Sequence, residues 1–447
     1  MSKGHTIPLL HLAHLLLRRR IFVTVFTTPA NHPFIANFLS ETNADILDLH
    51  FPENVSGIPA CIESTDKLPS ISLFHQFALA TALMQPDFEK ELEKLPAVNF
   101  LVSDSFLWWT AESAAKFGIP RLVFSGMSNY ATCLSKCVVE NRLLLGLESD
   151  DDLITLPDFP WIKITRNDFE SQFRDLEQQK ETPFSDFMFN IFMSYSISYG
   201  FISNSFYELE PLFADHLNQL QPTKTFCTGP FCLAIKTPNF AENQKPSWIK
   251  WLDEKLIQGK PVLYVAFGSQ AEISDDQLKE IAIGLEESMV NFLWVTRKIS
   301  DLEESVKGRG IIVKEWVDQM EILMHKSVEG FLSHCGWNST IESICAGVPI
   351  LAWPMMAEQP LNARMVVEEI KVGLRVETCN NGFVKSEGLK KMVKQLMEEE
   401  IGKEVKDNVK KYSEMAIKAI EEGTGSSSKT LDSLILEICG GKNGAIN

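Results

Sequence analysis

The sequence lacks the features that would place it in several broad classes of protein. No uninterrupted apolar run approaches the about 18 residues of a membrane-spanning helix, so we expect no stable membrane insertion. Acidic residues outnumber basic ones, 59 against 42, and the formal net charge of -17 disfavours a nucleic-acid or anionic-membrane partner. No GxGxxG segment follows an early strand, and no GxxxxGKS or GxxxxGKT segment occurs, so a dinucleotide site of that type has no support.

The nine cysteines are scattered, and they form no CxxC pair and no Cys/His ligand spacing. An odd number of unpatterned cysteines is typical of reduced thiols, so we expect a cytoplasmic protein without a metal site. The apolar stretch at 7–17 contains two histidines and is followed by three arginines. A secretory signal has its basic residues before the apolar core, so this order favours an amphipathic helix with a basic last turn.

A length of 447 residues predicts two domains, because a single core rarely grows so large. Short β-rich runs alternate with helical stretches in both halves, which is typical of βαβ units around a parallel sheet. The runs expected to be strands are 21–27, 44–49, 100–104, 121–125, 201–204, 261–267, 292–296 and 349–353. The domains and connections expected are an N-terminal domain at 1–236, a polar linker at 237–247, a C-terminal domain at 248–422, and a last helix within 423–447. The acidic run at 148–152 is expected to be a solvated loop.

Residues 316–359 carry the most informative pattern in the chain. Residues 329–333 are strand-like, and a polar turn containing His334 leads to a helix that opens at Asn338 and Ser339. In a parallel sheet such a turn lies at the carboxyl edge of the strands, where ligands bind. The free N–H groups of a helix start attract phosphate, and these three side chains add further donors. Glu342, one turn further on, could accept hydrogen bonds from ribose hydroxyls.

Each of these residues has a simpler explanation when it is taken alone. Asn338 or Ser339 could be an N-cap, which is the more common reason for such residues at a helix start. Trp316 could belong to the core, and Glu358 and Gln359 could belong to the surface. The functional interpretation therefore depends on their joint spacing.

That spacing closely resembles the signature segment of the plant secondary-product glycosyltransferases, which use uridine-diphosphate (UDP) sugars. The match runs from Trp316 to Gln359 and includes HCGWNS at 334–339, Glu342 and GVP at 347–349. Further matches are GHTIP at 4–8, LVSD at 101–104, NSFYELE at 204–210, GP at 229–230, WLD at 251–253 and FGS at 267–269. The resemblance implies the GT-B fold, in which two Rossmann-like parallel-sheet domains of the α/β class face a cleft. The N-terminal domain would bind the acceptor, the C-terminal domain would bind the donor, and the last helix would pack back on the N-terminal domain.

The resemblance also implies a role for each residue of the donor site. Trp316 would stack on uracil, and the main chain of Val317 would recognise the uracil edge. The other implied contacts are Gln319 and Glu342 with the ribose; Ser269, His334, Asn338 and Ser339 with the diphosphate; and Trp337, Glu358 and Gln359 with the sugar. Gln in the last position is associated with glucose donors, although Glu358 stands where many members have Asp. We therefore expect UDP-glucose as co-substrate, with no cofactor and no metal.

His5 and Asp104 occupy the positions of the family's catalytic pair. A neutral imidazole, whose ordinary pKa is about 6.5, can take the proton of an acceptor hydroxyl as the oxygen attacks the anomeric carbon. A carboxylate on the other ring nitrogen would fix the tautomer and stabilise the imidazolium. The expected outcome is inversion in one displacement. Without the resemblance, His5 would be interpreted as an ordinary residue at a helix start.

Four further residues, Phe106, Trp108, Phe124 and Met127, are candidates for an aromatic acceptor pocket, and core packing explains each of them equally well. The expected activity is transfer of glucose from UDP-glucose to a hydroxyl of a small phenolic plant metabolite such as a flavonoid. We expect the enzyme to be a monomer.

The chain departs from the family before the GHTIP motif, where members carry an apolar first strand and this sequence has only Met1, Ser2 and Lys3. The first strand of a doubly wound sheet is normally central. Its ladder bonds and buried side chains would be worth on the order of 10 kcal/mol, as much as the stability of a typical domain. The alternative expectation is therefore a truncated, catalytically weak variant that binds UDP-sugar through its C-terminal domain.

Overall fold

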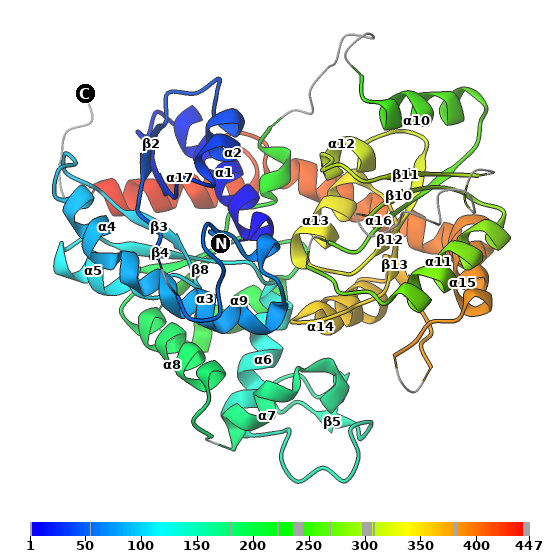
Figure 1. Ribbon diagram of the computed structural model, residues 1–447, viewed down its shortest axis with the longest axis horizontal. Helices are drawn as coiled ribbons and strands as arrows, with labels where there is room; N and C mark the ends of the chain where they lie inside the picture. Colours follow the sequence, from blue (N-terminus) through cyan, green and yellow to red (C-terminus); the bar gives the residue numbers. More distant parts are fainter. Residues whose placement is uncertain are drawn as a thin grey trace. The chain divides into compact units, whose positions relative to one another are not determined.

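The computed structural model describes residues 2–53, 55–178, 180–220, 223–235, 245–268, 270–296, 306, 309–379 and 382–440. The chain divides into two compact units (Figure 1). Unit 1 consists of Met1–Ile235 with Lys418–Asn447, and unit 2 of Lys236–Ile417. Most of the expected linker, 237–244, lies outside the described residues.

Unit 1 contains parallel strands in two separate sheets among its described residues. One sheet pairs β1 (Thr24–Thr27) with β2 (Asp45–Asp48). The other has the order β3-β4-β7-β8, with strands β3 (Leu101–Asp104), β4 (Arg121–Ser125), β7 (Gly200–Ser203) and β8 (Lys224–Cys227). A short antiparallel pair, β5 (Ile154–Thr155) and β6 (Lys163–Ile164), lies apart from both. Helices of the unit are α1 (Lys3–Arg18), α2 (His32–Phe38), α3 (Phe74–Ala80), α4 (Gln85–Leu92), α5 (Thr110–Lys116), α6 (Asn129–Asn141), α7 (Ser171–Glu177), α8 (Pro183–Ser196), α9 (Pro211–Leu220) and α17 (Ser426–Gly440).

The first and last helices share the core of unit 1. The amphipathic helix predicted near the N-terminus is confirmed as α1, and Arg18 provides its basic last turn. Leu12 and Leu16 on its buried face belong to one apolar cluster with Phe124 of β4 and with Leu431 and Leu434 of α17. The last helix thus packs in the first unit, although it lies more than 400 residues away in the sequence.

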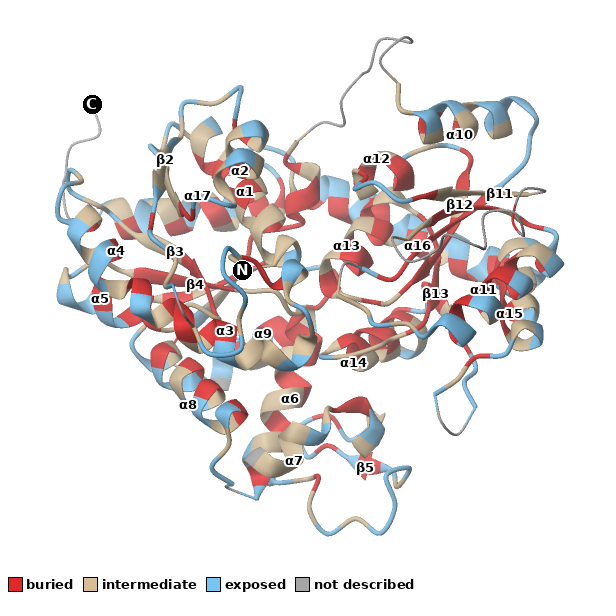
Figure 2. Ribbon diagram, in the orientation of Figure 1, coloured by how far each residue is buried: buried red, intermediate tan, exposed pale blue. Residues whose placement is uncertain are grey.

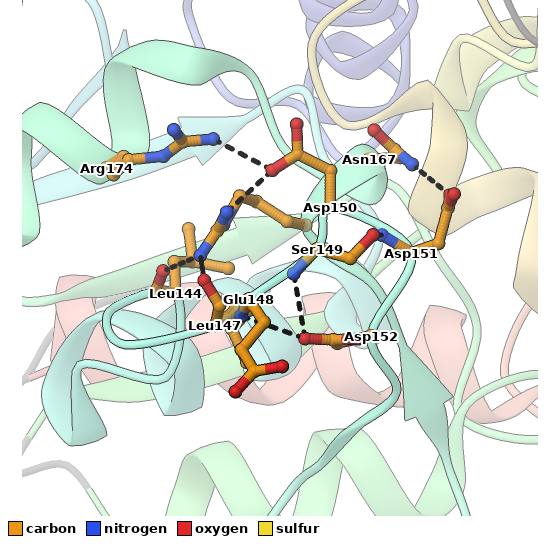
Figure 3. Close-up of polar contacts among 10 residues, drawn as sticks. Leu144, Leu147, Glu148, Ser149, Asp150, Asp151, Asp152, Asn167 and Arg174 are labelled. Atoms are coloured by element: carbon orange, nitrogen blue, oxygen red, sulfur yellow. Dashed lines mark hydrogen bonds and ion pairs between the residues drawn. The ribbon is translucent and has the colours of Figure 1, made fainter.

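The acidic run at 148–152 is an exposed loop, as predicted, and ion pairs order it (Figure 3). Nη1 of Arg166 donates to Asp150 Oδ1 at 2.6 Å, and Nη2 of Arg174 donates to the same oxygen at 3.3 Å. Nη2 of Arg166 also donates to the carbonyl oxygens of Leu144 and Leu147, at 3.0 and 3.2 Å. The side chain of Arg166 is largely buried, so it connects the loop to the buried residue Leu144.

Replacement of Arg166 by alanine should lower the free energy of unfolding by about 1–3 kcal/mol, because two carbonyl groups lose a charged donor. Arg174→Ala is the matched control, since Arg174 is more exposed and, among the described residues, its acceptor is the exposed Asp150. Its loss should cost less than about 1 kcal/mol. Urea unfolding followed by circular dichroism measures both values, and equal losses would contradict this interpretation.

Unit 2 is built on a six-stranded parallel sheet with the order β11-β10-β9-β12-β13-β14. Its strands are β9 (Val262–Ala266), β10 (Asn291–Val295), β11 (Gly310–Val313), β12 (Val328–Ser333), β13 (Ile350–Ala352) and β14 (Gly373–Arg375). Its helices are α10 (Ser247–Ile257), α11 (Asp275–Ser288), α12 (Gln319–Leu323), α13 (Trp337–Ala346), α14 (Gln359–Arg364), α15 (Ser386–Glu398) and α16 (Glu400–Ala419).

The central strand β9 shows that this sheet is covered on both faces. All of its residues are buried, and the neighbouring strand β12, which is labelled in Figure 2, is also mostly buried. Leu263 and Val265 belong to the apolar cluster on one face, whereas Val262 and Tyr264 belong to the cluster on the other. An apolar run without alternation is typical of such a strand. The strand order reverses between β9 and β12, so the carboxyl ends of these two strands form the position where ligands bind in open α/β sheets.

Every run predicted to be a strand overlaps an observed strand, and the predicted α/β class with two parallel-sheet units is confirmed.

Candidate functional site

The turn between β12 and α13 lies at the carboxyl edge of the unit 2 sheet. Its sharp bend uses a left-handed backbone at Cys335, where φ is 61°. Helix α13 begins at Trp337 with Gly336 as N-cap, and a glycine has no side chain with which to cap the helix. Asn338 and Ser339 are therefore the second and third helical residues, and neither is the N-cap. The start of a helix with a glycine N-cap at the carboxyl edge of a parallel sheet is a position where phosphate groups bind.

His334 is enclosed within this turn. A Cβ atom at Gly268 or at Gly336 would lie 2.8 or 2.6 Å from its Nε2 atom, so the ring needs glycine at both positions. Burial lowers the pKa of His334 to about 4, which keeps the imidazole neutral at neutral pH. Its Nδ1 atom is buried without a hydrogen-bond partner among the described residues. A buried polar atom in that state is what a bound ligand would satisfy.

Three predicted residues meet beside the start of α13. Nε2 of Gln319, at the start of α12, donates to Glu342 Oε2 at 2.6 Å and to Ser339 Oγ at 2.9 Å. The hydroxyl of Tyr264 donates to the other end of the Gln319 amide at 3.3 Å. Burial raises the pKa of Glu342 to about 7, and the hydrogen bond from Gln319 opposes that rise. These groups offer the acceptors that sugar hydroxyls require.

Trp316 and Val317 precede this network in the chain. The indole of Trp316 is 48% exposed, so it is not the core residue that its type alone would predict. Val317 is buried. An exposed indole next to a polar network provides an open aromatic face, on which a flat ring can stack.

Glu358 is the N-cap of α14 and Gln359 is its first residue, and hydrogen bonds connect this helix start to the turn between β12 and α13. Oε1 of Gln359 accepts from the main-chain N–H groups of Met355 and Met356 at 2.9 and 3.0 Å. Nδ2 of Asn362 donates to Cys335 O at 3.0 Å and to Glu358 Oε1 at 3.4 Å. One amide therefore holds the predicted sugar-binding segment against the turn between β12 and α13.

The structure limits two predictions for this site. Ser269 lies outside the described residues. The indole of Trp337 is buried in the core, so a contact with a sugar would have to come from its main chain.

The predicted pair of unit 1 is brought together by packing of α1 on β3. His5 lies in the first turn of α1, and Asp104 is the last residue of β3. His5 Nδ1 lies 2.5 Å from Asp104 Oδ2, and the N–H of Phe106 donates to Asp104 Oδ1 at 2.8 Å. Burial alone would raise the pKa of Asp104, but the charge and hydrogen bond of His5, with the N–H of Phe106, hold that pKa below its usual range. Asp104 is thus a carboxylate when it faces the imidazole.

Aromatic rings extend from His5 into unit 1. The imidazole stacks on Phe106 with ring centroids 4.9 Å apart and meets Phe124 edge-on at 6.2 Å. Phe106 in turn contacts Phe74 of α3 and Phe187 of α8, at 5.3 and 5.6 Å. Trp108 packs in the same cluster, and Met127 is partly buried.

Sequence reasoning did not identify Phe74 and Phe187, nor His75, which packs on Phe187 at 5.7 Å. The helical spacing of aromatic residues within α3 and α8 was the available signal. It indicates a buried helix face but not which helix the face contacts.

Within the described ranges, no cluster of three or more His, Cys, Asp or Glu side chains could hold a metal ion. In the same ranges, no helix is both long enough and apolar enough to cross a membrane.

Comparisons with known proteins bear on both units. The profile described as "UDP-glucoronosyl and UDP-glucosyl transferase" matches residues 245–418. The chain is 54% identical to UDP-glycosyltransferase 90A1 of Arabidopsis thaliana, over 98% of this chain and 95% of the relative. It is 37% identical to scopoletin glucosyltransferase of Nicotiana tabacum, over 98% of this chain and 96% of the relative.

Solved structures give the same result for the fold. The structure of Glycyrrhiza uralensis UGT73P12 with glycyrrhetinic acid 3-O-monoglucuronide matches with a TM-score of 0.87 and 30% identity, over 98% of this chain and 94% of that one. The structure of Phytolacca americana UGT2 with UDP-2fluoro-glucose and pterostilbene matches with a TM-score of 0.82 and 27% identity, over 98% of both chains. The fold class predicted from the sequence is confirmed.

Proposed function

The chain belongs to the plant UDP-glycosyltransferase family, and on that premise we propose that it transfers glucose from UDP-glucose to a hydroxyl of a small phenolic acceptor, with inversion at the anomeric carbon. Family membership makes it an enzyme that uses a UDP-sugar. The choice of glucose, the acceptor class, the stereochemistry and the residue roles below are our proposal.

The observation that carries the proposal is the buried, neutral His334, whose Nδ1 atom has no hydrogen-bond partner among the described residues, next to the start of α13 with its glycine N-cap. In our proposal the first N–H groups of α13, with His334, Asn338 and Ser339, bind the diphosphate. Its negative charge would complement the positive end of the helix dipole.

Neighbouring side chains would bind the uracil, the ribose and the sugar of the donor. Trp316 would stack on uracil while the main chain of Val317 meets the uracil edge. Gln319 and Glu342, already hydrogen-bonded to each other at 2.6 Å, would hold the ribose. Glu358 and Gln359 would bind the sugar. The carbonyl end of Gln359 is taken by two main-chain N–H groups, so its amide would present N–H donors to sugar hydroxyls.

His5 would act as the general base. Its Nδ1 atom is engaged by Asp104, so the acceptor proton would pass to Nε2 while the acceptor oxygen bonds to the anomeric carbon. The bond from that carbon to the diphosphate would break in the same step, and UDP would leave. Asp104 would stabilise the imidazolium that forms. We propose that this step needs no metal.

A phenolic acceptor is supported by the rings around the imidazole. Phe106 stacks on His5, and Phe74 and Phe187 extend the aromatic surface away from it. Aromatic rings favour offset or edge-on contacts with one another, so such a wall suits a flat acceptor. The tobacco relative is named for scopoletin, and the Phytolacca structure holds pterostilbene.

A transfer assay tests the proposal. Purified protein is given UDP-glucose or UDP-galactose with a panel of flavonoids, coumarins and simple phenols, in the presence of excess EDTA. We expect a β-glucoside from UDP-glucose, identified by mass spectrometry and by the proton coupling at the anomeric carbon. An α-glucoside would contradict inversion, and loss of activity in EDTA would contradict metal independence. Donor binding without transfer to any acceptor would instead favour the catalytically weak alternative.

A further inference from the structure

Arg121 is a buried arginine whose guanidinium reaches the main chain of Asp104. It lies on β4 and is 1% exposed. Its Nε atom donates to the hydroxyls of Ser103 and Thr110, at 2.8 and 3.0 Å. Its Nη1 atom donates to Ser194 and Ser198, at 3.4 and 2.9 Å, and its Nη2 atom to the main-chain oxygen of Asp104 at 3.4 Å.

These hydrogen bonds do not neutralise the positive charge of Arg121. Each hydrogen-bond partner of Arg121 is a neutral oxygen, and within the described residues it forms no ion pair at contact distance. Burial lowers the pKa of Arg121 to about 10, with the charge of Asp104 acting in the opposite direction, so the guanidinium stays charged at neutral pH. A buried cation is costly unless a buried anion balances it. Asp104, whose main chain Arg121 touches, is the buried anion available.

The charge balance between Arg121 and Asp104 determines whether His5 can act as a base. With His5 neutral, Arg121 and Asp104 together carry no net charge. Without Arg121 the buried carboxylate loses this compensating charge, which favours a proton on His5, and a protonated imidazole cannot accept the proton of an acceptor.

We propose that Arg121 is a positioning residue that keeps His5 unprotonated, because its charge balances the buried Asp104 carboxylate. This inference rests on the proposed function, since it assumes that His5 is the base. Arg121 acts through Asp104 and touches neither substrate.

The other groups around the pair differ in charge. The charge of the N-terminal amine also lowers the pKa of Asp104. Phe106 and Phe124 present aromatic rings to His5. Tyr195 of α8 is partly buried, and burial raises its pKa to about 12, so it is neutral. Lys3, on the same helix as His5, lies over the ring of Phe34, with its Nζ atom 5.2 Å from the ring centroid.

The test is the pH dependence of kcat/KM for glucosyl transfer in wild type, Arg121→Met and Arg121→Lys. The acid limb reports protonation of the base in the free enzyme. We expect Arg121→Met to move this limb to higher pH by about one unit or more, and Arg121→Lys to restore the wild-type position. A limb that stays in place in Arg121→Met, with only a lower rate, would overturn the inference in favour of a structural role.

Ser198→Ala is the matched control. It removes the 2.9 Å hydrogen bond from Arg121 but keeps the guanidinium charge. We expect a lower thermal midpoint and an unmoved acid limb. A limb that moved as far as in Arg121→Met would show that hydrogen-bonded geometry, and not charge, determines the protonation of His5.

A second measurement leaves Arg121 in place, which matters if Arg121→Met does not fold. In Asp104→Asn, His5 loses its anion and faces the guanidinium alone. Its imidazole, assigned by comparison with His5→Gln, should titrate by NMR below the ordinary value of about 6.5. Titration at or above that value would overturn the inference. Because this readout needs no turnover, it also separates failure of the inference from failure of the proposed function, which would appear as absence of transfer in the wild type.

Discussion

Replacing His5 with alanine should reduce kcat for glucosyl transfer by about 10²–10⁴-fold, the usual contribution of a general base. The reason is that the acceptor hydroxyl would then attack while still carrying its proton. The dissociation constant for UDP should stay unchanged, since His5 lies in unit 1 and the proposed donor residues lie in unit 2. Steady-state kinetics and calorimetric titration with UDP measure the two effects.

A second His–Asp pair in unit 1 provides the control for this experiment. His32 Nδ1 lies 2.7 Å from Asp48 Oδ1, and both side chains are about two-fifths exposed. His32→Ala should leave kcat near the wild-type value. A weaker affinity for UDP in His5→Ala, with a preserved turnover rate, would contradict the role of His5 as base.

Replacing Trp316 with alanine should have the largest effect on donor binding. Stacking of a base on an aromatic ring is worth about 1–3 kcal/mol, so the dissociation constant for UDP should rise about 5- to 150-fold. The indole is already 48% exposed, so its removal should leave the core and the thermal midpoint nearly unchanged. Calorimetric titration with UDP measures the change.

Trp161 supplies the comparison, because it is a similarly exposed tryptophan, 55% exposed, in unit 1. Trp161→Ala should bind UDP as the wild type does. Trp316→Phe should recover part of the lost affinity, since a smaller aromatic face remains. An unaltered dissociation constant in Trp316→Ala would remove the basis for placing uracil there.

The arrangement of the proposed donor site in unit 2 could be predicted from the sequence because its parts are close together in the chain. Strand, turn and helix follow one another between residues 328 and 346, so a local pattern specifies a local structure. Ser339 and Glu342 follow Gln319 by only 20 and 23 residues, and Gln319 is hydrogen-bonded to both of them. Most strands of the parallel sheets were predicted from their apolar runs, whereas β8, β11 and β14 were not.

The proposed acceptor site in unit 1 could not be predicted in the same way, because long-range packing creates it. His5 and Asp104 lie 99 residues apart, and only a family resemblance paired them. Arg121 gave no signal as a single basic residue opening a strand, since its importance comes from burial against the main chain of Asp104. Phe74 and Phe187 reach the same cluster from helices more than 100 residues apart, an arrangement that no local pattern encodes.

The Asn362 amide, which contacts both the Cys335 carbonyl and Glu358, has a consequence for how this enzyme can evolve. Mutations at 358 and 359, the positions proposed to bind the sugar, would also disturb the turn that is proposed to hold the pyrophosphate oxygens. A switch of donor would then show epistasis, because the first substitution would weaken attachment of every nucleotide sugar alike. Restoring that attachment would require a second change at position 362, so new donor preferences would be reached through paired substitutions.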